Sequence, residues 1–443
     1  MRARSQNIAI VSLGCEKNTV NTEQMMFLLS EAGYSLTKDT GGAEAVIVNT
    51  CAFIESAKME SIEAILELGE AKKAGRIGRI IVTGCLPQRY KEEILAEMPE
   101  IDAVLGTGSY DEIISVIEPI KGSLRPLERY GDINSPVSET GRVITTPVSW
   151  AYLKVAEGCD NRCAYCAIPG IRGRFRSRRI ENVVGEAVQL ADKGVRELIL
   201  IAQDLTGFGQ DMYGESRLVE LLDNLSGIEK IRWIRLHYLY PGKINDKLID
   251  VIANSDKIVK YMDVPIQHIS DNVLRRMNRR GGSAEIRALF KDIRERIPGV
   301  VIRTSIITGL PGEGDEEFEE LSGFLREAGI ERAGVFAYSP EEGTPAAQMP
   351  YPGRETAERR KELIEGIQSQ IMDEFTTSRI GSEIEVLVEG ESEIGGYNYG
   401  RSYAESPDID GRVLITGKGP AIGDFVRVRI TGTIDNEPVG EII

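Results

Sequence analysis

Three cysteines in one short loop constrain this chain more than any other feature of its sequence. Cys159, Cys163 and Cys166 follow an apolar, strand-like run at 148–155 with the spacing CxxxCxxC, and no fourth cysteine follows nearby. A loop of this length can direct three sulfurs at one metal centre and leave one coordination position open. Iron–sulfur clusters and zinc both accept thiolates, so the spacing predicts a metal centre without deciding the metal.

Length, composition and charge constrain the number of domains, the cellular compartment and the kind of partner of this chain. The chain has 443 residues, enough for several domains. It contains no membrane-length apolar run and no leader-like start, which predicts a cytoplasmic protein without a membrane partner. Six cysteines in a reducing compartment indicate ligands or catalysts rather than disulfides. The net charge of −16 argues against a general nucleic-acid binder and favours a basic partner.

Residues 1–120 alternate short apolar runs with amphipathic segments, the pattern of βαβ units. This alternation predicts an α/β domain with a doubly wound parallel sheet. The strands are expected at 8–13, 45–48, 79–82 and 101–105, and the helices at 22–32, 54–71, 88–98 and 111–117. Cys15, Cys51 and Cys85 each follow one of the first three strands, at the sheet edge where such folds bind ligands. We therefore predict a second three-thiolate site.

Two other interpretations of these three cysteines stay open. Cysteine is often a small buried hydrophobe, although chance would then have to place it at the same strand end three times. Zinc is the second alternative. Because the chain has only two histidines, His237 and His268, zinc would need a carboxylate or water as its fourth ligand at both sites.

The rest of the chain divides into three segments. Residues 121–147, rich in Gly, Pro and Ser, are predicted to form a linker or surface hairpin. Residues 148–377 contain six strand–helix repeats, which predict a partial barrel of six parallel strands with catalytic groups at their C-terminal ends. Residues 378–443 change to short strands with Gly-rich turns, which predict a small antiparallel β-barrel of the OB-like kind. This last segment has six basic and twelve acidic residues, so a basic protein suits it better than phosphates.

Together these motifs resemble the radical S-adenosylmethionine methylthiotransferases. The CxxxCxxC loop after the first barrel strand, with Tyr165 before the third cysteine, is similar to the superfamily signature. The three-cysteine first domain and the C-terminal barrel, a TRAM domain, extend the resemblance over nearly the whole chain. The members that modify a ribosomal protein are the most similar, through the stretches 14–18, 49–54, 84–90, 99–104 and 406–411. Glu16 and Ala52 stand where proline and glycine are usual, and neither change removes a ligand.

The resemblance implies two 4Fe-4S clusters and S-adenosylmethionine as both methyl donor and radical source. Cys159, Cys163 and Cys166 would hold the cluster that cleaves S-adenosylmethionine to a radical. An auxiliary cluster carrying an exogenous sulfur would be held by the other three cysteines, Cys15, Cys51 and Cys85. The implied product is a 3-methylthio-aspartate in small-ribosomal-subunit protein twelve. The implied partners are this basic protein, free or on the ribosome, and an electron donor such as flavodoxin or ferredoxin.

Further site residues follow from the same resemblance. Contacts to S-adenosylmethionine are expected from Tyr165, Gln203, Asp204, Arg303, Gly309, Pro311 and Gly312. A helix cap at 203–204 and a purely structural turn at 309–312 are the alternatives. A substrate carboxylate or an anionic cluster would attract the arginine run at 171–179, through Arg172, Arg174 and Arg176. A solvated basic face is the alternative for this run. We assign no role to either histidine.

Two other functions stay open. The first is methylthiolation of an isopentenylated adenosine in transfer RNA, which the acidic C-terminal barrel disfavours. The second is a non-catalytic iron–sulfur redox sensor that docks on ribosomes.

Overall fold

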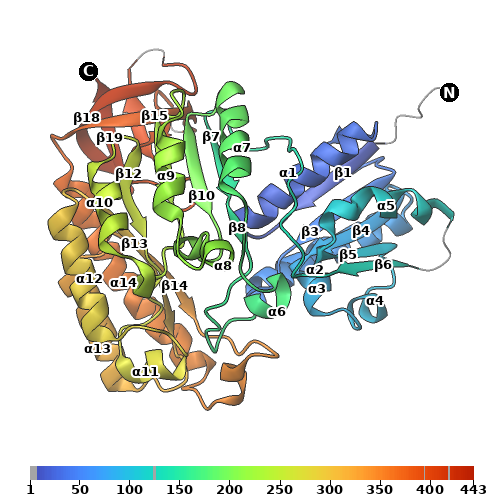
Figure 1. Ribbon diagram of the computed structural model, residues 1–443, viewed down its shortest axis with the longest axis horizontal. Coiled ribbons are helices and arrows are strands. Elements are labelled where there is room, and N and C mark those ends of the chain that lie inside the picture. Colours follow the sequence, from blue (N-terminus) through green and yellow to red (C-terminus); the bar gives the residue numbers. More distant parts are fainter. Residues whose placement is uncertain (1–6, 123–125, 394, 418–419) are drawn as a thin grey trace.

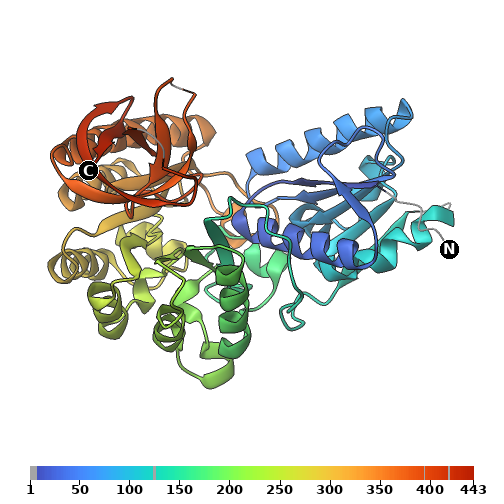
Figure 2. The same ribbon diagram turned by 90° about the horizontal axis from the view of Figure 1, so that it is seen from above.

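The computed structural model describes residues 7–122, 126–393, 395–417 and 420–443. Lys418 of the C-terminal segment, residues 123–125 of the predicted linker and residues 1–6 of the predicted first domain lie outside the described residues. Three domains follow one another along the chain, and the first and the last both border the central one (Figures 1 and 2).

Buried strands rich in β-branched residues form the sheet of the first domain. β3 (Ala45–Thr50) is buried at every position and β4 (Arg79–Gly84) at all but its first, as expected for strands covered on both faces. All six strands are parallel, in the order β2-β1-β3-β4-β5-β6. The other four are β1 (Asn7–Ser12), β2 (Ser35–Thr37), β5 (Ala103–Gly108) and β6 (Leu127–Gly131).

Helices cover both faces of this sheet. One apolar cluster packs α1 and α5 on one face, and a second packs α2, α3 and α4 on the other. The helices are α1 (Glu16–Glu31), α2 (Glu55–Lys73), α3 (Cys85–Arg89), α4 (Ile94–Glu97) and α5 (Ile113–Ile117). The predicted doubly wound α/β domain is therefore confirmed. The single helix predicted at 88–98 is instead two short helices, because the backbone leaves the helical conformation at Tyr90, with φ −116° and ψ 51°. Arg89, the last residue of α3, pairs with Glu341 of the central domain at 2.7 Å.

Two edge strands of this sheet escape the sequence pattern. β2 has only three residues, and β6 lies inside the segment predicted as a linker at 121–147. β6 pairs in parallel with β5, yet most of its side chains are exposed or half-buried. An exposed edge strand shows no apolar alternation, which is why its sequence reads as a loop. The remainder of that segment crosses to the central domain.

Six parallel strands, in the order β14-β13-β12-β11-β10-β7, make the central sheet, which is not closed. They are β7 (Trp150–Lys154), β10 (Glu197–Ile201), β11 (Trp233–Leu236), β12 (Ile258–Asp263), β13 (Val301–Thr308) and β14 (Arg332–Ala337). The long helices outside it are α7 (Ile180–Asp192), α9 (Leu218–Ser226), α10 (Asp246–Asn254), α12 (Ser283–Arg296), α13 (Asp315–Ala328) and α14 (Arg354–Ser378). Three short helices complete the domain, α6 (Ile168–Arg172), α8 (Gln210–Tyr213) and α11 (Asp271–Arg276). The predicted partial barrel of six strand–helix repeats is confirmed.

The C-terminal strands close into a small barrel, as predicted. Its order is β15-β16-β17-β19-β18, and every pair is antiparallel except β17 with β19. The strands are β15 (Glu383–Glu391), β16 (Asn398–Arg401), β17 (Val413–Thr416), β18 (Phe425–Ile434) and β19 (Glu437–Ile442). The parallel closing pair corrects the expectation of a wholly antiparallel barrel. The sequence pattern also missed β19, whose strand period is interrupted by a glycine and a proline.

Buried ion pairs fasten the C-terminal barrel to the inner face of the central sheet. Alternate residues of a strand face opposite sides of the sheet. In the central sheet one side packs on the outer helices, and some residues on the other, inner side are charged. Glu197 of β10 pairs with Arg401 of β16 at 2.7 Å. The wholly buried Glu405 accepts from Arg379 at 2.5 Å and from Arg332 of β14 at 3.3 Å. The segment between β16 and β17 therefore lines the floor of the partial barrel.

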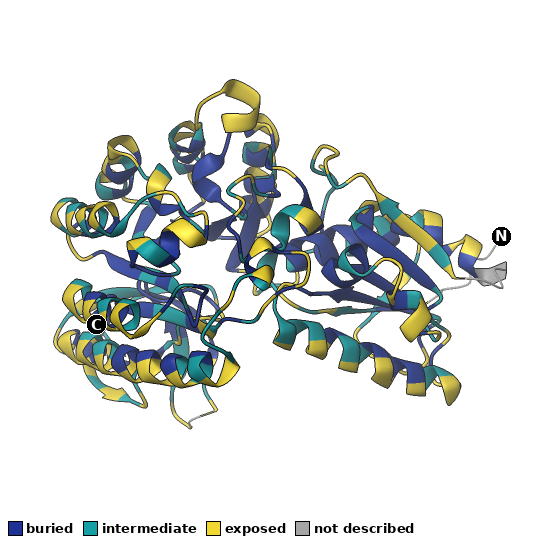
Figure 3. Ribbon diagram, turned by 90° about the horizontal axis from the view of Figure 1, so that it is seen from below, coloured by how far each residue is buried: buried dark blue, intermediate teal, exposed yellow. Residues whose placement is uncertain are grey.

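Burial follows this arrangement. Figure 3 shows both large sheets buried and the outer faces of their helices exposed. No helix in the described ranges combines the length and apolar character that crossing a bilayer requires.

We expect Glu405→Gln to destabilise the protein strongly. Burial raises the pKa of Glu405, but Arg379 and Arg332 lower it by more, to about 2, so the carboxylate is charged at neutral pH. Removing one partner from a buried ion pair costs about 3–5 kcal/mol. Urea unfolding of the cluster-free protein measures this loss, and Asp408→Asn, an exposed change in the same segment, is the matched control. Equal unfolding free energies for the two variants would contradict the buried-pair assignment.

Candidate functional site

The CxxxCxxC loop leaves the C-terminal end of the first strand of the central sheet. Its base is closed by a two-stranded ribbon, in which β8 (Ala156–Glu157) pairs antiparallel with β9 (Arg176–Ser177). We call Cys159, Cys163 and Cys166 the barrel triad. Cys163 is buried, the other two are half-buried, and all three are free thiols. The predicted position at a strand end of the barrel is confirmed.

Neighbouring segments hold this loop by its backbone and by several of its side chains. The amide of Ala164 donates to the Met277 carbonyl, and its own carbonyl accepts from the Ala346 amide, both at 2.9 Å. The Asn161 side chain, inside the loop, donates to Asp204 at 2.8 Å. Asp204 also accepts from Lys243 at 2.5 Å. The predicted cofactor residue Asp204 therefore anchors the cysteine loop.

Arg279 is a residue of this site that the sequence pattern missed. Its Nη1 lies 3.6 Å from Cys163 Sγ and 3.2 Å from the Tyr165 hydroxyl, and its Nη2 donates to the Pro265 carbonyl at 2.5 Å. The guanidinium also stacks over the Tyr240 ring at 4.9 Å. Arg279 stands in a strongly basic stretch that reads as a solvated surface, so only the fold shows that it turns inward.

Burial favours the protonated form of two thiols of the barrel triad. It raises the pKa of Cys159 to about 11 and that of Cys166 to about 12, although backbone N–H groups of Asn161 and Ile168 act in the opposite direction. A metal centre that uses these sulfurs as thiolates must therefore displace their protons on binding.

The three cysteines of the first domain converge as predicted, and we call them the N-terminal triad. Cys15 precedes α1, Cys51 follows β3 and Cys85 begins α3. Burial, together with the neighbouring Cys85 and Cys15, raises the pKa of Cys51 to about 12, so both of these sulfurs lie close to that of Cys51. The side chain of Asn18 donates to the Leu13 and Thr50 carbonyls, both at 2.9 Å. It thereby ties the Cys15 loop to the Cys51 loop.

Two glycines permit this convergence. Gly14 has a φ of +87°, and a Cβ added there would lie 2.6 Å from the Cβ of Cys51. Gly84 has a φ of +97°, and its Cβ would lie 2.5 Å from the Thr50 carbonyl oxygen. A side chain at either position would strain the backbone and push two cysteine loops apart.

The donors around both triads suit anionic sulfur. Each triad has a guanidinium on one of its sulfurs: Arg279 lies near Cys163, and Arg172 lies 3.5 Å from Cys85 Sγ. The amide of Asn161 also points at Cys159 Sγ at 3.5 Å. Iron–sulfur clusters are tuned by hydrogen bonds of this kind to their sulfurs. Within the described residues, no three His, Cys, Asp or Glu side chains surround a point closely enough to hold a single metal ion.

Arg172 and Glu157 join the two triads. Arg172, in α6, donates to Glu157 at 3.1 Å and also bonds the Asn18 side chain of α1. Glu157 immediately precedes the CxxxCxxC loop and accepts in addition from Lys154 at 3.0 Å and Gln203 at 2.9 Å. The predicted cofactor residue Gln203 therefore lies beside the barrel triad, with its amide engaged by a protein carboxylate.

The other predicted cofactor residues are held by neighbouring protein groups. Arg303, on the inner face of the sheet, pairs with Asp263 at 3.0 Å and lies 3.8 Å from Asp410 of the C-terminal barrel. Close contacts surround the 309–312 turn, because an added Cβ would meet Ala357 at 2.3 Å at its first glycine, Gly309, and Arg276 at 2.4 Å at its last, Gly312. Pro311 is buried, and Leu310 packs with Ala164 of the cysteine loop. This turn supports the loop from behind.

The structure also shows the burial and the contacts of the arginine run and of the two histidines. Arg172 is buried, Arg174 is exposed, and Arg176 is half-buried with its Nη1 on the carbonyls of the other two. Among the three, Arg174 is the most open to solvent and so the most accessible to a substrate. His237 bonds Ser406 at 2.9 Å and His268 bonds Glu313 at 3.1 Å, so both are tied into the protein.

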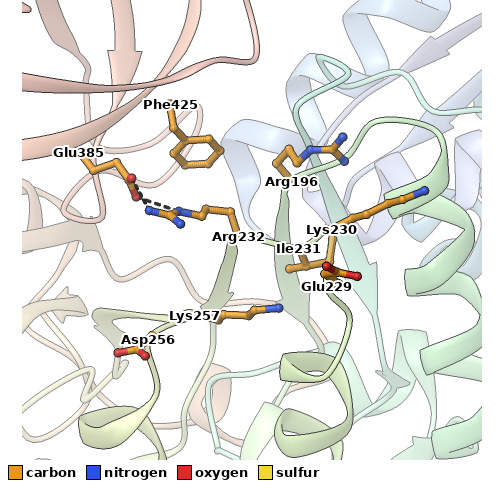
Figure 4. A pocket seen from close by; sticks show the side chains of 9 residues that line it. All are labelled: Arg196, Glu229, Lys230, Ile231, Arg232, Asp256, Lys257, Glu385 and Phe425. Atoms are coloured by element: carbon orange, nitrogen blue, oxygen red, sulfur yellow. Dashed lines mark hydrogen bonds and ion pairs between the residues drawn. The ribbon is translucent and has the colours of Figure 1, made fainter.

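A pocket of about 540 Å³ opens at the opposite end of the strands (Figure 4). Its lining comes from the segments that precede β10, β11 and β12 and from the C-terminal barrel. Its cations are engaged: Arg232 pairs with Glu385 at 2.6 Å and Lys230 with Asp192 at 2.7 Å. We assign the chemistry to the end that carries the triads.

Comparisons with known protein families match each domain. Residues 7–106 match the uncharacterized protein family UPF0004, residues 153–325 match the Radical SAM superfamily, and residues 380–443 match the TRAM domain. The chain is 47% identical to the ribosomal protein uS12 methylthiotransferase RimO of Acetivibrio thermocellus, over 99% of this chain and 98% of that protein. It is also 47% identical to the protein of the same name from Caldanaerobacter subterraneus subsp. tengcongensis, over 98% of this chain and all of that protein.

Solved structures share the fold at much lower identity. The radical S-adenosylmethionine methyltransferase TsrM of Kitasatospora setae, with cobalamin and a [4Fe-4S] cluster bound, superposes with a TM-score of 0.57 at 15% identity, over 77% of each chain. The cobalamin-dependent S-adenosylmethionine radical enzyme OxsB superposes with a TM-score of 0.55 at 12% identity, over 83% of this chain and 55% of OxsB.

We expect Arg279→Gln to weaken iron retention at the barrel triad. The change removes a cation that contacts Cys163 and Tyr165 and ties them to Pro265. In a background with Cys15, Cys51 and Cys85 replaced by alanine, anaerobic reconstitution should give about four irons per chain. Arg279→Gln should lower that count after gel filtration, whereas Arg280→Gln, at the exposed neighbouring position, should not. Equal iron in both variants would show that the Arg279 contacts do not hold the loop.

Proposed function

Because the chain belongs to the RimO family of radical S-adenosylmethionine methylthiotransferases, we propose that it places a methylthio group on the β carbon of an aspartate in ribosomal protein uS12. It is an enzyme that transfers a sulfur-containing group, and its cofactors are S-adenosylmethionine and [4Fe-4S] clusters. The observation that best supports the proposal is the pair of thiol triads, each buried or half-buried, that Arg172 and Glu157 join.

Two triads suit a reaction with two tasks. In this proposal the barrel triad would hold a cluster that supplies radical chemistry on S-adenosylmethionine, and the N-terminal triad would hold an auxiliary cluster that supplies the sulfur. The protein's own part is to position the two sites and to exclude water. Asp204 and Asn161 fix the cysteine loop, and Asn18 fixes the first-domain loops.

The inner face of the barrel is covered on two sides. α1 packs Val20 against Trp150 and Tyr152 of β7, and Lys17 lies 3.2 Å from the centre of the Tyr238 ring. The segment between β16 and β17 covers the floor of the barrel. The two triads lie where the first domain meets the strand ends of the central domain. We propose that the substrate aspartate reaches them there.

The remaining assignments complete the proposal. The first domain, predicted at 1–120 and extended by β6, would present the sulfur. Residues 148–377 would generate the radical, and 378–443 would complete the barrel and offer an acidic surface to the basic substrate protein. The proposed cofactor contacts are those expected at Tyr165, Gln203, Asp204, Arg303 and the 309–312 turn. Arg174 is proposed to meet the substrate. We further propose a cytoplasmic location and a flavodoxin- or ferredoxin-type electron donor.

The transfer-RNA and redox-sensor alternatives are less well supported. The chain is similar over almost its full length to relatives named for uS12, and the redox-sensor alternative does not account for two joined triads. The outcomes of one assay separate all three.

We expect two cysteine variants to fail at different steps. Wild-type protein reconstituted with about eight irons, then given dithionite, S-adenosylmethionine, sulfide, uS12 and transfer RNA, should form 5′-deoxyadenosine and methylthiolated uS12. The transfer RNA, checked by mass spectrometry in the same mixture, should stay unmodified. Cys51→Ala should still form deoxyadenosine but no methylthiolated product, because only the sulfur-presenting site is lost. Cys163→Ala should form neither. Mass spectrometry of uS12 and chromatography of the nucleoside give the two readouts.

Other outcomes would overturn parts of the assignment. Methylthiolated uS12 from Cys51→Ala would remove the auxiliary role of the N-terminal triad. Modification of transfer RNA with unmodified uS12 would favour the first alternative. Absence of deoxyadenosine from the fully loaded wild type would favour the sensor.

A further inference from the structure

Arg172 belongs to the central domain but reaches into the first. The short helix α6 follows the CxxxCxxC loop, and its residue Ile171 is part of an apolar core of the first domain. The Thr107 hydroxyl of β5 donates to the Ile171 carbonyl at 2.5 Å, which fixes the helix there. At the end of α6, Arg172 is only 2% exposed.

The guanidinium of Arg172 contacts both halves of the site at once. Nη1 donates to Glu157, two residues before Cys159, at 3.1 Å, and Nη2 lies 3.5 Å from Cys85 Sγ and bonds Asn18. Because the Arg172 side chain is almost fully buried, these contacts fix its position. The planar fork of an arginine can serve two directions in this way, whereas a lysine offers one point of charge.

Protein groups neutralise the positive charge of Arg172 only in part. Its carboxylate partner, Glu157, is shared with Lys154. The other contacts of Arg172 are the neutral Asn18 side chain and the sulfur of Cys85. A buried cation that shares its counter-ion is costly unless another anion is near. An anionic cluster on the N-terminal triad would be that anion.

We infer that Arg172 is a positioning residue shared by the two triads: it fixes the N-terminal triad against the cysteine loop and favours the reduced state of a cluster held by Cys85. Reduction adds negative charge to a cluster, and a fixed cation on a ligand sulfur stabilises that charge. The inference rests on the proposed function only in taking the N-terminal triad as a cluster site.

The test is a redox titration of the auxiliary cluster alone. Protein with Cys159, Cys163 and Cys166 changed to alanine is reconstituted anaerobically and titrated with dithionite, and the reduced cluster is followed by electron paramagnetic resonance. Arg172→Gln should shift the midpoint to a more negative potential. Arg172→Lys, which keeps the charge, should stay closer to the parent, and Arg179→Gln, at an exposed site of the same arginine run, should not shift it.

Iron content covers the case in which a variant does not hold its cluster. Loss of iron from Arg172→Gln with retention in Arg172→Lys supports the role of the charge. Equal loss from both, or equal retention with an unchanged midpoint, overturns it. No readout depends on turnover, so a protein that failed to modify uS12 could still bear out this role of Arg172.

Discussion

The buried contact between Arg172 and Glu157 is the constraint on which the arrangement of the two triads depends. Burial raises the pKa of Glu157, but Lys154 and Arg172 lower it by more and hold it well below its ordinary value. The carboxylate therefore stays charged and fixes two cations that come from different segments. One of these, Arg172, carries the link into the first domain. A change in how the first domain sits on the barrel would break this contact, the α6 packing and the contact to Cys85 together.

Buried ion pairs also determine which charges of the C-terminal barrel remain on its surface. Its acidic excess in sequence predicts a surface for a basic partner, yet part of its charge never reaches solvent. Glu405 is enclosed with Arg379, and Arg401 is enclosed between Glu197 and Glu389. These buried pairs roughly cancel, so the exposed residues keep the acidic excess. The barrel therefore serves as the floor of the central domain on one side and as an acidic surface on the other.

The sequence predicts the elements that depend on local pattern, namely the parallel sheet of the first domain, the partial barrel of the central domain and the two groups of cysteines. The triads are predictable because parallel strands bring their C-terminal ends to one edge, wherever the cysteines lie in the chain. Arg279 and Arg172 are harder to place, since each stands in a basic run that suits a solvated surface equally well. Long-range packing alone turns these two inward. β6 is missed for the related reason that an exposed edge strand has no apolar period.

Magnetic coupling between the two clusters tests most directly whether the triads form one site. In the doubly loaded, reduced protein we expect electron paramagnetic resonance to show spin–spin interaction between the clusters, because a single side chain, Arg172, spans from Glu157, two residues before Cys159, to Cys85. The interaction should vanish in Cys159→Ala and in Cys51→Ala, each of which retains one cluster. A wild-type spectrum equal to the sum of the two single-cluster spectra would contradict a joined site.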